Sequence, residues 1–305
     1  MKFLLLFIPF LIFPQARIAE GFALDKVTKK PIPYVNISII DSQIGTSSNE
    51  DGSYSLQIKK EDLNKTVKLS SLGYKDTMFV VKSLLKLKAL FLQSKVEQLD
   101  EVVISEKFEE EFLEINPIKK NEIVGGIGGM REHPYIFALY IPFDSLFSKT
   151  EYINKAKILL NKTSPLGGSQ SMSSKFRFRM FAVGKDSLPE NDLISKNIIV
   201  ETTKKQRQVD IDLSELNLVF PREGVYVAIE WLYITTNAYK FSYTKKKSRK
   251  KYVETRYAPR ISWIKRKGTT NNLAVYSSGT WYAMPIPSSK KNEYIVPAIT
   301  LTLSN

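Results

Sequence analysis

Short apolar runs separated by turn-forming residues constrain the fold of this chain more than any other feature. In the segment YVNISII, residues 34–40, apolar and polar side chains alternate with a period of two. That period is typical of a β-strand with one buried face. Similar runs follow at intervals of roughly 8–12 residues, which predicts an all-β sandwich. The predicted strands are 18–24, 34–40, 53–58, 67–71, 77–81 and 89–92.

The β pattern returns after about residue 123. The segment FRFRMFAV, residues 176–183, predicts a strand with one apolar and one polar face. GVYVAIEWLYI, residues 224–234, is apolar on both faces apart from Glu230, which predicts a central strand covered on each side. Further strands are predicted at 209–213, 218–220 and 295–303, and the best helical candidates are 153–160 and 188–195.

The first residues predict export. MKFLLLFIPFLIF, residues 1–13, has one positive charge and then an apolar run too short for the roughly 20 residues that span a bilayer. This pattern is typical of a secretory signal peptide, which we place at 1–19. We expect a first β-sandwich at 20–95, a linker at 96–122 and a second β domain at 123–305. No second apolar stretch reaches about 18 residues, so we expect no transmembrane segment in the mature chain.

Cysteine and histidine usage removes most metal and nucleophile chemistry. The chain has no cysteine and a single histidine, His133. The absence of cysteine excludes disulfides, thiolate zinc sites, iron–sulfur clusters and cysteine nucleophiles. The single histidine excludes any site that needs two or more imidazoles, including the HExxH metal sites. We therefore expect no metal site and no cofactor. An exported chain without cysteine also favours a Gram-negative bacterial protein, located in the periplasm or at the outer membrane.

Most of the net charge of +14 lies in residues 240–267. This segment has 12 basic residues and one acidic residue, so it contributes 12 − 1 = +11. Interleaved aromatic residues make the segment suitable for anionic headgroups or acidic polysaccharide. The alternative is a solvated loop without a ligand, and we do not expect nucleic acid because an exported protein rarely meets it. The predicted ligand contacts are Lys245, Lys246, Lys247, Arg249, Lys250, Lys251, Trp263, Lys265, Arg266 and Lys267.

Four motifs follow one another with specific spacing in the first part of the chain. They are GFALD at 21–25, KPIPYVNISI at 30–39, GTSSNEDGSYSL at 45–56 and LSSLGYKD at 69–76. In this order residues 18–92 resemble the carboxypeptidase-regulatory-like domain of bacterial envelope proteins. The resemblance implies a seven-stranded, transthyretin-like sandwich. Similar domains precede the plug of TonB-dependent outer-membrane receptors, and a segment like LDEVVIS, here 99–105, follows them there.

We do not expect receptor or carboxypeptidase activity to transfer with this resemblance. A receptor would continue into a plug and a barrel of about 22 strands, whereas only about 200 residues follow the domain here. The family name refers to a non-catalytic accessory domain, and zinc peptidases of that class need two histidine ligands. The second half resembles the C-terminal region that accompanies this domain in envelope proteins, through 176–183, 188–200, 209–232 and Trp281. That resemblance implies a second, larger β-sandwich, with a jelly roll as one form, and supplies no catalytic residue.

Glu230 is the one residue that favours an enzyme. A buried carboxylate has a raised pKa unless it is paired, and a glycan hydrolase needs a second carboxylate at about 5–10 Å. Arg177 and Arg179 lie on another predicted strand and offer an ion pair with this possible buried carboxylate instead. We prefer the ion pair, and with it the absence of catalytic residues.

These observations predict a non-enzymatic, exported binding or structural module of the cell envelope. The first sandwich would act as a spacer or docking unit, and the second would present the basic segment to a glycan, an anionic surface or an envelope protein. Two alternatives stay open. One is a carboxylate-based glycan hydrolase, and the other is an accessory of a TonB-linked outer-membrane uptake system, which rests on LDEVVIS alone.

Overall fold

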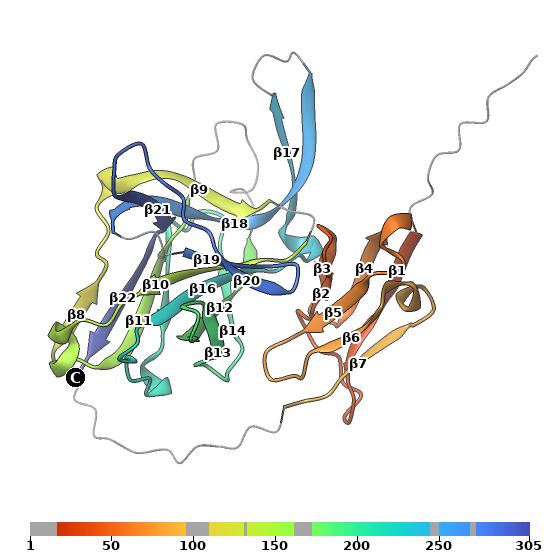
Figure 1. Cartoon of the computed structure of the whole chain (residues 1–305), viewed down its shortest axis with the longest axis horizontal. Coiled ribbons are helices and arrows are strands. Elements are labelled where there is room, and N and C mark those ends of the chain that lie inside the picture. The colour runs from red at the N-terminus through yellow and green to blue at the C-terminus, as the bar shows by residue number, and fades with distance from the viewer. Residues whose placement is uncertain (1–16, 96–109, 131–132, 162–172, 245–249, 269–272) are drawn as a thin grey trace, which may run out of the picture.

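The protein consists of two β domains that lie side by side (Figure 1). The computed structural model describes residues 17–95, 110–130, 133–161, 173–244, 250–268 and 273–305. Every regular element in these ranges is a strand or a short 3₁₀ helix, which confirms the predicted all-β class. None of the helices in these ranges is long and apolar enough to cross a membrane.

The first domain is a sandwich of seven strands within residues 17–95, as the family resemblance predicts. Its two sheets have the orders β4–β1–β7 and β3–β2–β5–β6. The alternating pattern explains the packing, because Ile37 pairs with Leu69 and Ile39 pairs with Val67 across β2 and β5, and all four are fully buried. The elements are β1 (Arg17–Asp25), β2 (Asn36–Ile39), β3 (Gly45–Ser47), β4 (Ser53–Ile58), η1 (Lys60–Asp62), β5 (Thr66–Ser70), β6 (Thr77–Val80), η2 (Val81–Leu85) and β7 (Ala89–Leu92).

The second domain is a larger sandwich built on a seven-stranded sheet. Six of its strands have the order β13–β12–β16–β10–β19–β20, and β14 pairs with β12. These strands are β10 (Ile136–Ile141), β12 (Ser174–Val183), β13 (Pro189–Asp192), β14 (Ile198–Thr202), β16 (Val225–Trp231), β19 (Leu273–Ser277) and β20 (Thr280–Ala283). As predicted, β16 is a central strand, and every residue in it is buried.

Two four-stranded sheets cover the inner face of the seven-stranded sheet. Their orders are β15–β11–β22–β8 and β17–β18–β21, with β9 paired to β18. All three sheets contribute to one apolar core. The strands are β8 (Phe112–Ile115), β9 (Ile123–Gly129), β11 (Tyr152–Leu159), β15 (Gln208–Asp212), β17 (Ala238–Thr244), β18 (Lys251–Lys267), β21 (Glu293–Pro297) and β22 (Ile299–Ser304), and the helices are η3 (Lys120–Glu122), η4 (Ser145–Lys149), η5 (Ser214–Leu216) and η6 (Thr235–Asn237).

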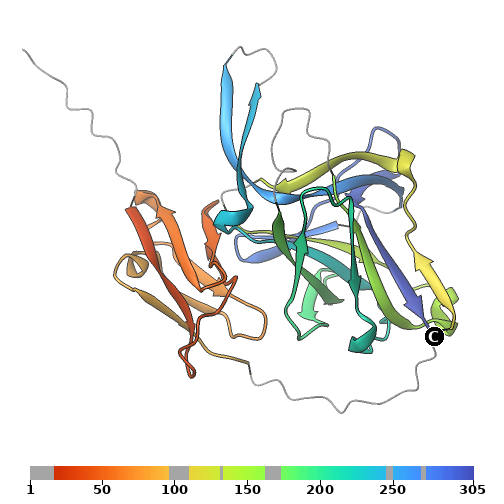
Figure 2. The ribbon, with the colours of Figure 1, turned by 180° about the vertical axis from the view of Figure 1, so that it is seen from behind.

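The two faces of the seven-stranded sheet have different partners. Phe176, Phe178 and Met180 of β12 point into the inner core, whereas Arg177 and Arg179 lie on the outer face. The first domain covers part of this outer face, and Figures 1 and 2 both show β2 and β3 on the side that faces the second domain. The polar face predicted for 176–183 is therefore partly covered by the first domain and is not fully exposed to solvent.

The predicted helices at 153–160 and 188–195 are wrong. The first is strand β11, and a bulge between Ile153 and Lys155 shifts its register, so that its buried residues do not alternate strictly. Because of this shift, the spacing of the apolar residues in the sequence also fits a helix, although the segment is a strand. The second contains strand β13. The strand predicted at 218–220 is reduced to one isolated bridge between Tyr152 and Val219.

Two predicted segment boundaries also need correction. Strand β8 lies inside the linker expected at 96–122 and pairs with β22, so the second domain includes residues from 112 onward. At the other end, strand β1 begins at Arg17 and pairs with β4 from that residue. Residues 17–19, which we assigned to the signal peptide, therefore form part of the first sandwich. The remainder of the predicted signal peptide lies outside the described residues.

Candidate functional site

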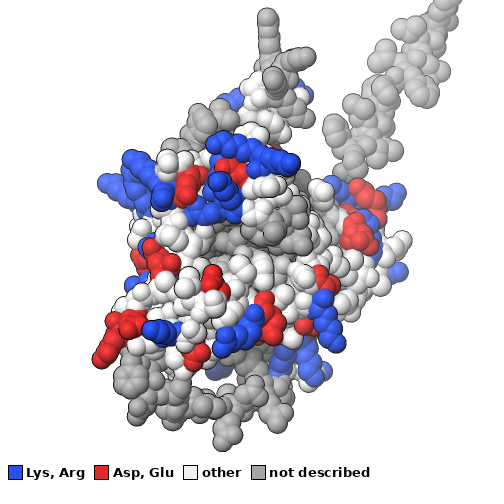
Figure 3. Space-filling model, turned by 60° about the vertical axis from the view of Figure 1, so that its left-hand side comes forward, with Lys and Arg blue, Asp and Glu red and all other residues white. Residues whose placement is uncertain are grey.

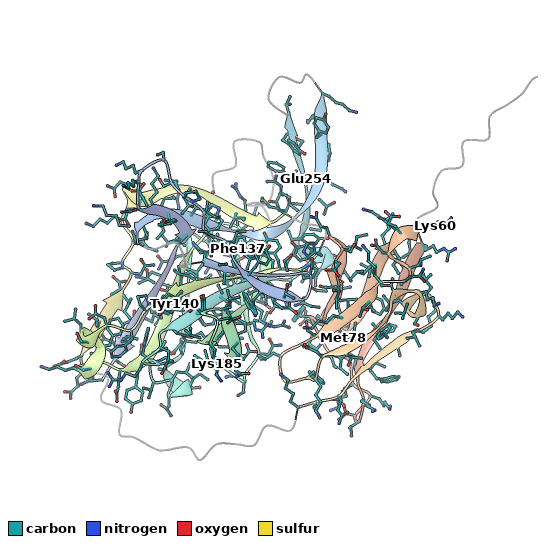
Figure 4. All side chains as sticks on the ribbon, in the orientation of Figure 1. Lys60, Met78, Phe137, Tyr140, Lys185 and Glu254 are labelled. Carbon is teal, nitrogen blue, oxygen red and sulfur yellow. The ribbon has the colours of Figure 1, made fainter. Side chains whose placement is uncertain are left out.

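A hairpin arm, residues 238–244 and 250–257, projects from the second domain (Figure 1). It consists of β17 and the first part of β18, which pair from Ala238–Tyr257 to Thr244–Lys251. Figure 4 shows Glu254 on this arm, outside the body of the domain in which Phe137 lies. Because antiparallel partners share a face of the ribbon, the arm presents two different surfaces.

Aromatic rings line one face of the arm. The ring centroids of Phe241 and Tyr243 are 6.1 Å apart, and those of Tyr243 and Tyr252 are 5.6 Å apart across the two strands. The guanidinium of Arg256 stacks on Phe241 at 3.4 Å from the ring centroid. Cross-strand aromatic pairs and cation–π contacts of this kind stabilise a hairpin that has little other support.

The predicted basic residues that the structure describes fall into two separate groups. Lys245, Lys246, Lys247 and Arg249 lie outside the described residues, and Lys250 and Lys251 are exposed on the arm. The other four predicted contacts lie in the last part of β18, which pairs with β9 and β21. A strand rises about 3.3 Å per residue, so the two ends of β18 are separated by about 50 Å of strand. The structure thus corrects the single patch that the sequence suggested.

Two of the predicted ligand contacts in that last part of β18 have structural partners. Trp263 packs against the inner core, with its ring centroid 5.6 Å from that of Phe137. Arg266 forms an ion pair with Glu122 at 2.7 Å and donates a hydrogen bond to Asn116 at 2.6 Å. Lys265 is half-buried and Lys267 is exposed. On the face shown in Figure 3, basic side chains gather toward the end from which the arm rises, and acidic and basic side chains are mixed elsewhere.

Glu230 lies in a charged network on the outer face of the seven-stranded sheet. Arg177, its register partner on β12, donates to Oε1 of Glu230 at 2.5 Å, and Arg179 donates to Oε2 at 3.2 Å. Arg179 also pairs with Asp192 at 2.5 Å. Asn36 of the first domain donates to Oε1 of Glu230 at 2.6 Å. The network therefore joins the two domains.

The burial of this network determines its chemistry. Glu230 is 0% exposed and Arg177 is 1% exposed, so substrate and solvent do not reach the carboxylate. Burial alone would raise the pKa of Glu230, but Arg177 and Arg179 outweigh that effect and hold its pKa below the ordinary value. A carboxylate that stays ionised and enclosed does not act as a proton donor to a substrate. Glu230 is thus placed as a structural charge between the domains.

Further contacts hold the domains together around this network. Arg177 donates to the backbone oxygen of Tyr34 at 2.9 Å. The backbone N–H of Tyr233 donates to Oγ of Ser47 at 3.1 Å, and Lys175 pairs with Glu50 at 3.1 Å. Tyr34 also packs with the buried Leu232 and Ile234. These contacts connect positions that are 125 or more residues apart in the chain, so the sequence pattern gave no sign of them.

A cleft of about 470 Å³ opens beside the network, between the two domains. Sequence reasoning missed it because its walls come from six separate segments of the chain. His133 does not line it, since that side chain is buried, with Nε2 2.6 Å from Oγ of Ser277. In the described parts of the chain no group of three or more His, Cys, Asp or Glu side chains is placed to hold a metal ion.

The lowered pKa of Glu230 predicts sensitivity to acid. The unfolded chain has the ordinary glutamate pKa, so the network stabilises the fold fully above that pKa and loses its effect as pH falls through the lower folded-state pKa. We expect the free energy of unfolding to fall more steeply below pH about 4 in the wild type than in Glu230→Gln. Denaturant unfolding at a series of pH values measures this difference, and parallel curves would contradict it.

The comparison with known families concerns the first domain. Residues 19–104 match the family model of the CarboxypepD_reg-like domain, and the match ends before strand β8. A search of curated proteins found no match for this chain. The matched range covers all seven strands of the first sandwich except the first two residues of β1. The N-terminal sandwich is therefore a carboxypeptidase-regulatory-like domain, as its sequence motifs predict.

Proposed function

We propose that this protein is a non-enzymatic, exported binding module of the bacterial envelope, and that its arm attaches to an anionic surface. The observation that carries the proposal is the projecting arm, which combines an aromatic face with cationic residues at its end. The matched first domain is a generic sandwich, and in this proposal it serves as a spacer next to the attaching domain.

The arm has the composition that an anionic interface requires. Tyrosine rings place an apolar body and a polar hydroxyl at such a boundary, and lysine extends its charge toward anionic groups. Tyr243 and Tyr252 lie in the half of the arm away from the body, close to the exposed Lys250 and Lys251. On the opposite face of the ribbon Val253 is 62% exposed. A two-stranded ribbon is marginally stable alone, which favours a role in contact with a surface.

Charge removal on the arm tests this proposal. We expect Lys250→Gln/Lys251→Gln to weaken binding to vesicles that contain an anionic phospholipid by about 30-fold, because each lysine near such a surface contributes on the order of 1 kcal/mol. The difference should shrink as salt increases, since mobile ions screen exposed charges. Vesicle sedimentation at two salt concentrations, with neutral vesicles as reference, measures both effects.

Two exposed lysines on the body provide a matched control. Lys204 and Lys205 are also neighbours in the chain, and they lie in the turn between β14 and β15. Lys204→Gln/Lys205→Gln removes the same charge and should leave vesicle binding within about 2-fold of the wild type, because the arm alone would approach the surface. Equal losses in the two variants would show a general charge effect and overturn the assignment to the arm.

A further inference from the structure

The interdomain cleft has the dimensions of a ligand site. Its volume of about 470 Å³ falls within the usual range of small-molecule pockets, roughly 300–1,000 Å³. The first domain contributes Lys68 and Ser70 of β5 and the turn that follows. The second contributes the outer face of β12, strand β13 and the β19–β20 hairpin. None of the described residues of the arm lines the cleft, so this inference does not depend on the function proposed for the arm.

Basic and acidic side chains are equal in number in the lining of the cleft, which contains Lys68, Lys95, Arg177 and Arg179 together with Asp76, Asp186, Glu190 and Asp192. Lys68 lies 2.9 Å from Asp76 in the first domain. Across the cleft Arg179 donates to both carboxylate oxygens of Asp192, at 2.8 and 2.5 Å. Because Lys68 and Arg179 each have a carboxylate partner and the lining as a whole carries no net charge, the cleft offers fixed donors and acceptors side by side and does not favour an anion. Sugar hydroxyls both donate and accept, so they match such pairs.

One wall of the cleft is aromatic. Trp281 of β20 is half-buried and contacts Phe181 at 5.2 Å and Tyr276 at 5.3 Å between ring centroids, both edge to face. Phe181 is buried, and these contacts hold the indole in place. A ring that is fixed in this way provides a flat apolar surface, on which the C–H groups of a pyranose ring pack.

We infer that this interdomain cleft binds a neutral saccharide, with Trp281 as the stacking surface and the Arg179–Asp192 and Lys68–Asp76 pairs as partners of the sugar hydroxyls. The two domains share the site, since one pair comes from each. Glu230 accepts hydrogen bonds from Arg179 of the second domain and from Asn36 of the first, so the buried network contacts a residue in each wall of the cleft. A phosphate-bearing ligand would meet as many acidic as basic side chains in this cleft, which does not favour it.

Calorimetry with the full chain and a panel of neutral tetrasaccharides tests the inference. The panel is cellotetraose, maltotetraose, xylotetraose and mannotetraose, with tetragalacturonate as the acidic comparison. We expect at least one neutral member to bind in preference to the acidic one, and Trp281→Ala to weaken that binding by at least about 10-fold. Trp281→Tyr keeps a stacking ring and should retain most of the affinity.

Two further variants separate loss of the site from loss of the fold. Ser71→Trp fills the cleft from the opposite wall without removing any residue of the network, and it should also weaken binding. Trp263→Phe changes a tryptophan outside the cleft and should leave saccharide binding unchanged. No binding of any neutral member at millimolar concentration, a preference for tetragalacturonate, or unchanged binding in both Trp281→Ala and Ser71→Trp would overturn the inference. Vesicle binding by the arm should be unaffected in either variant.

Discussion

Glu230→Ala should lower the free energy of unfolding of the second domain by about 3–5 kcal/mol, because removal of one partner from a buried ion pair leaves an uncompensated charge. Arg177 is 1% exposed, so water does not replace the lost carboxylate. Asn36 also loses the acceptor of its 2.6 Å hydrogen bond. Tryptophan fluorescence during denaturant unfolding reports this loss selectively, since all three tryptophans lie in the second domain.

A paired variant distinguishes charge burial from simple loss of contacts. Arg177→Met/Glu230→Met removes both charges and fills similar space, and we expect it to recover much of the stability that Glu230→Ala loses. Recovery will be incomplete, because the Tyr34 carbonyl and the Asn197 side chain also accept hydrogen bonds from Arg177. Glu215→Ala, an exposed change in η5, should cost less than about 0.5 kcal/mol. A small effect of Glu230→Ala would contradict the structural role of the network.

Glu230→Ala should also loosen the contact between the two domains. The chain has no cysteine, so spin labels can be attached at introduced cysteines alone. Glu61 in the first domain and Lys204 in the second are exposed and suit this purpose. We expect the distance distribution between labels at these positions to broaden in Glu230→Ala. An unchanged distribution would mean that the other interdomain contacts hold the domains without the network.

Local patterns were sufficient to predict most of the strands. Polar and apolar residues alternate in β2 and β12, and β16 is a nearly continuous apolar run, and a single sequence records both patterns directly. The prediction for β11 was wrong where a bulge interrupts the alternation, because the pattern then fits a helical spacing as well. β8 was missed inside an acidic segment, since only half of its residues are partly buried and none is fully buried.

The candidate sites were harder to predict, for a geometric reason. The ion pair of Glu230 with arginines on a neighbouring strand was predictable from residue type and strand position. Its contact with Asn36 was not, since 194 residues separate the two positions. The cleft depends on the same long-range docking. Conversely, the basic segment looked like one patch because its residues are adjacent in the chain, whereas a 17-residue strand carries its two ends far apart.

Trp231→Ala should be as costly as Glu230→Ala but for a different reason. Trp231 is the next residue on β16 and faces the inner core, where it is 0% exposed and contacts Phe137 edge to face at 5.6 Å. Truncation of a large buried aromatic side chain costs about 3–5 kcal/mol through lost burial and the cavity left behind. Denaturant unfolding followed by circular dichroism measures the loss. Trp263 and Trp281 remain as fluorescent reporters.

The indole N–H of Trp231 allows the two contributions to be separated. It donates to the backbone oxygen of Pro259 at 2.8 Å, so Trp231→Phe keeps much of the ring and removes this bond. We expect Trp231→Phe to cost about 1–3 kcal/mol, the range for an unsatisfied buried partner, and Trp231→Ala to cost more. The decisive comparison is with Glu230 on the opposite face of the same strand. Trp231→Ala should leave the interdomain spin-label distances unchanged while the second domain is destabilised, and broadened distances would show that the outer face of the sheet depends on the packing of its inner face.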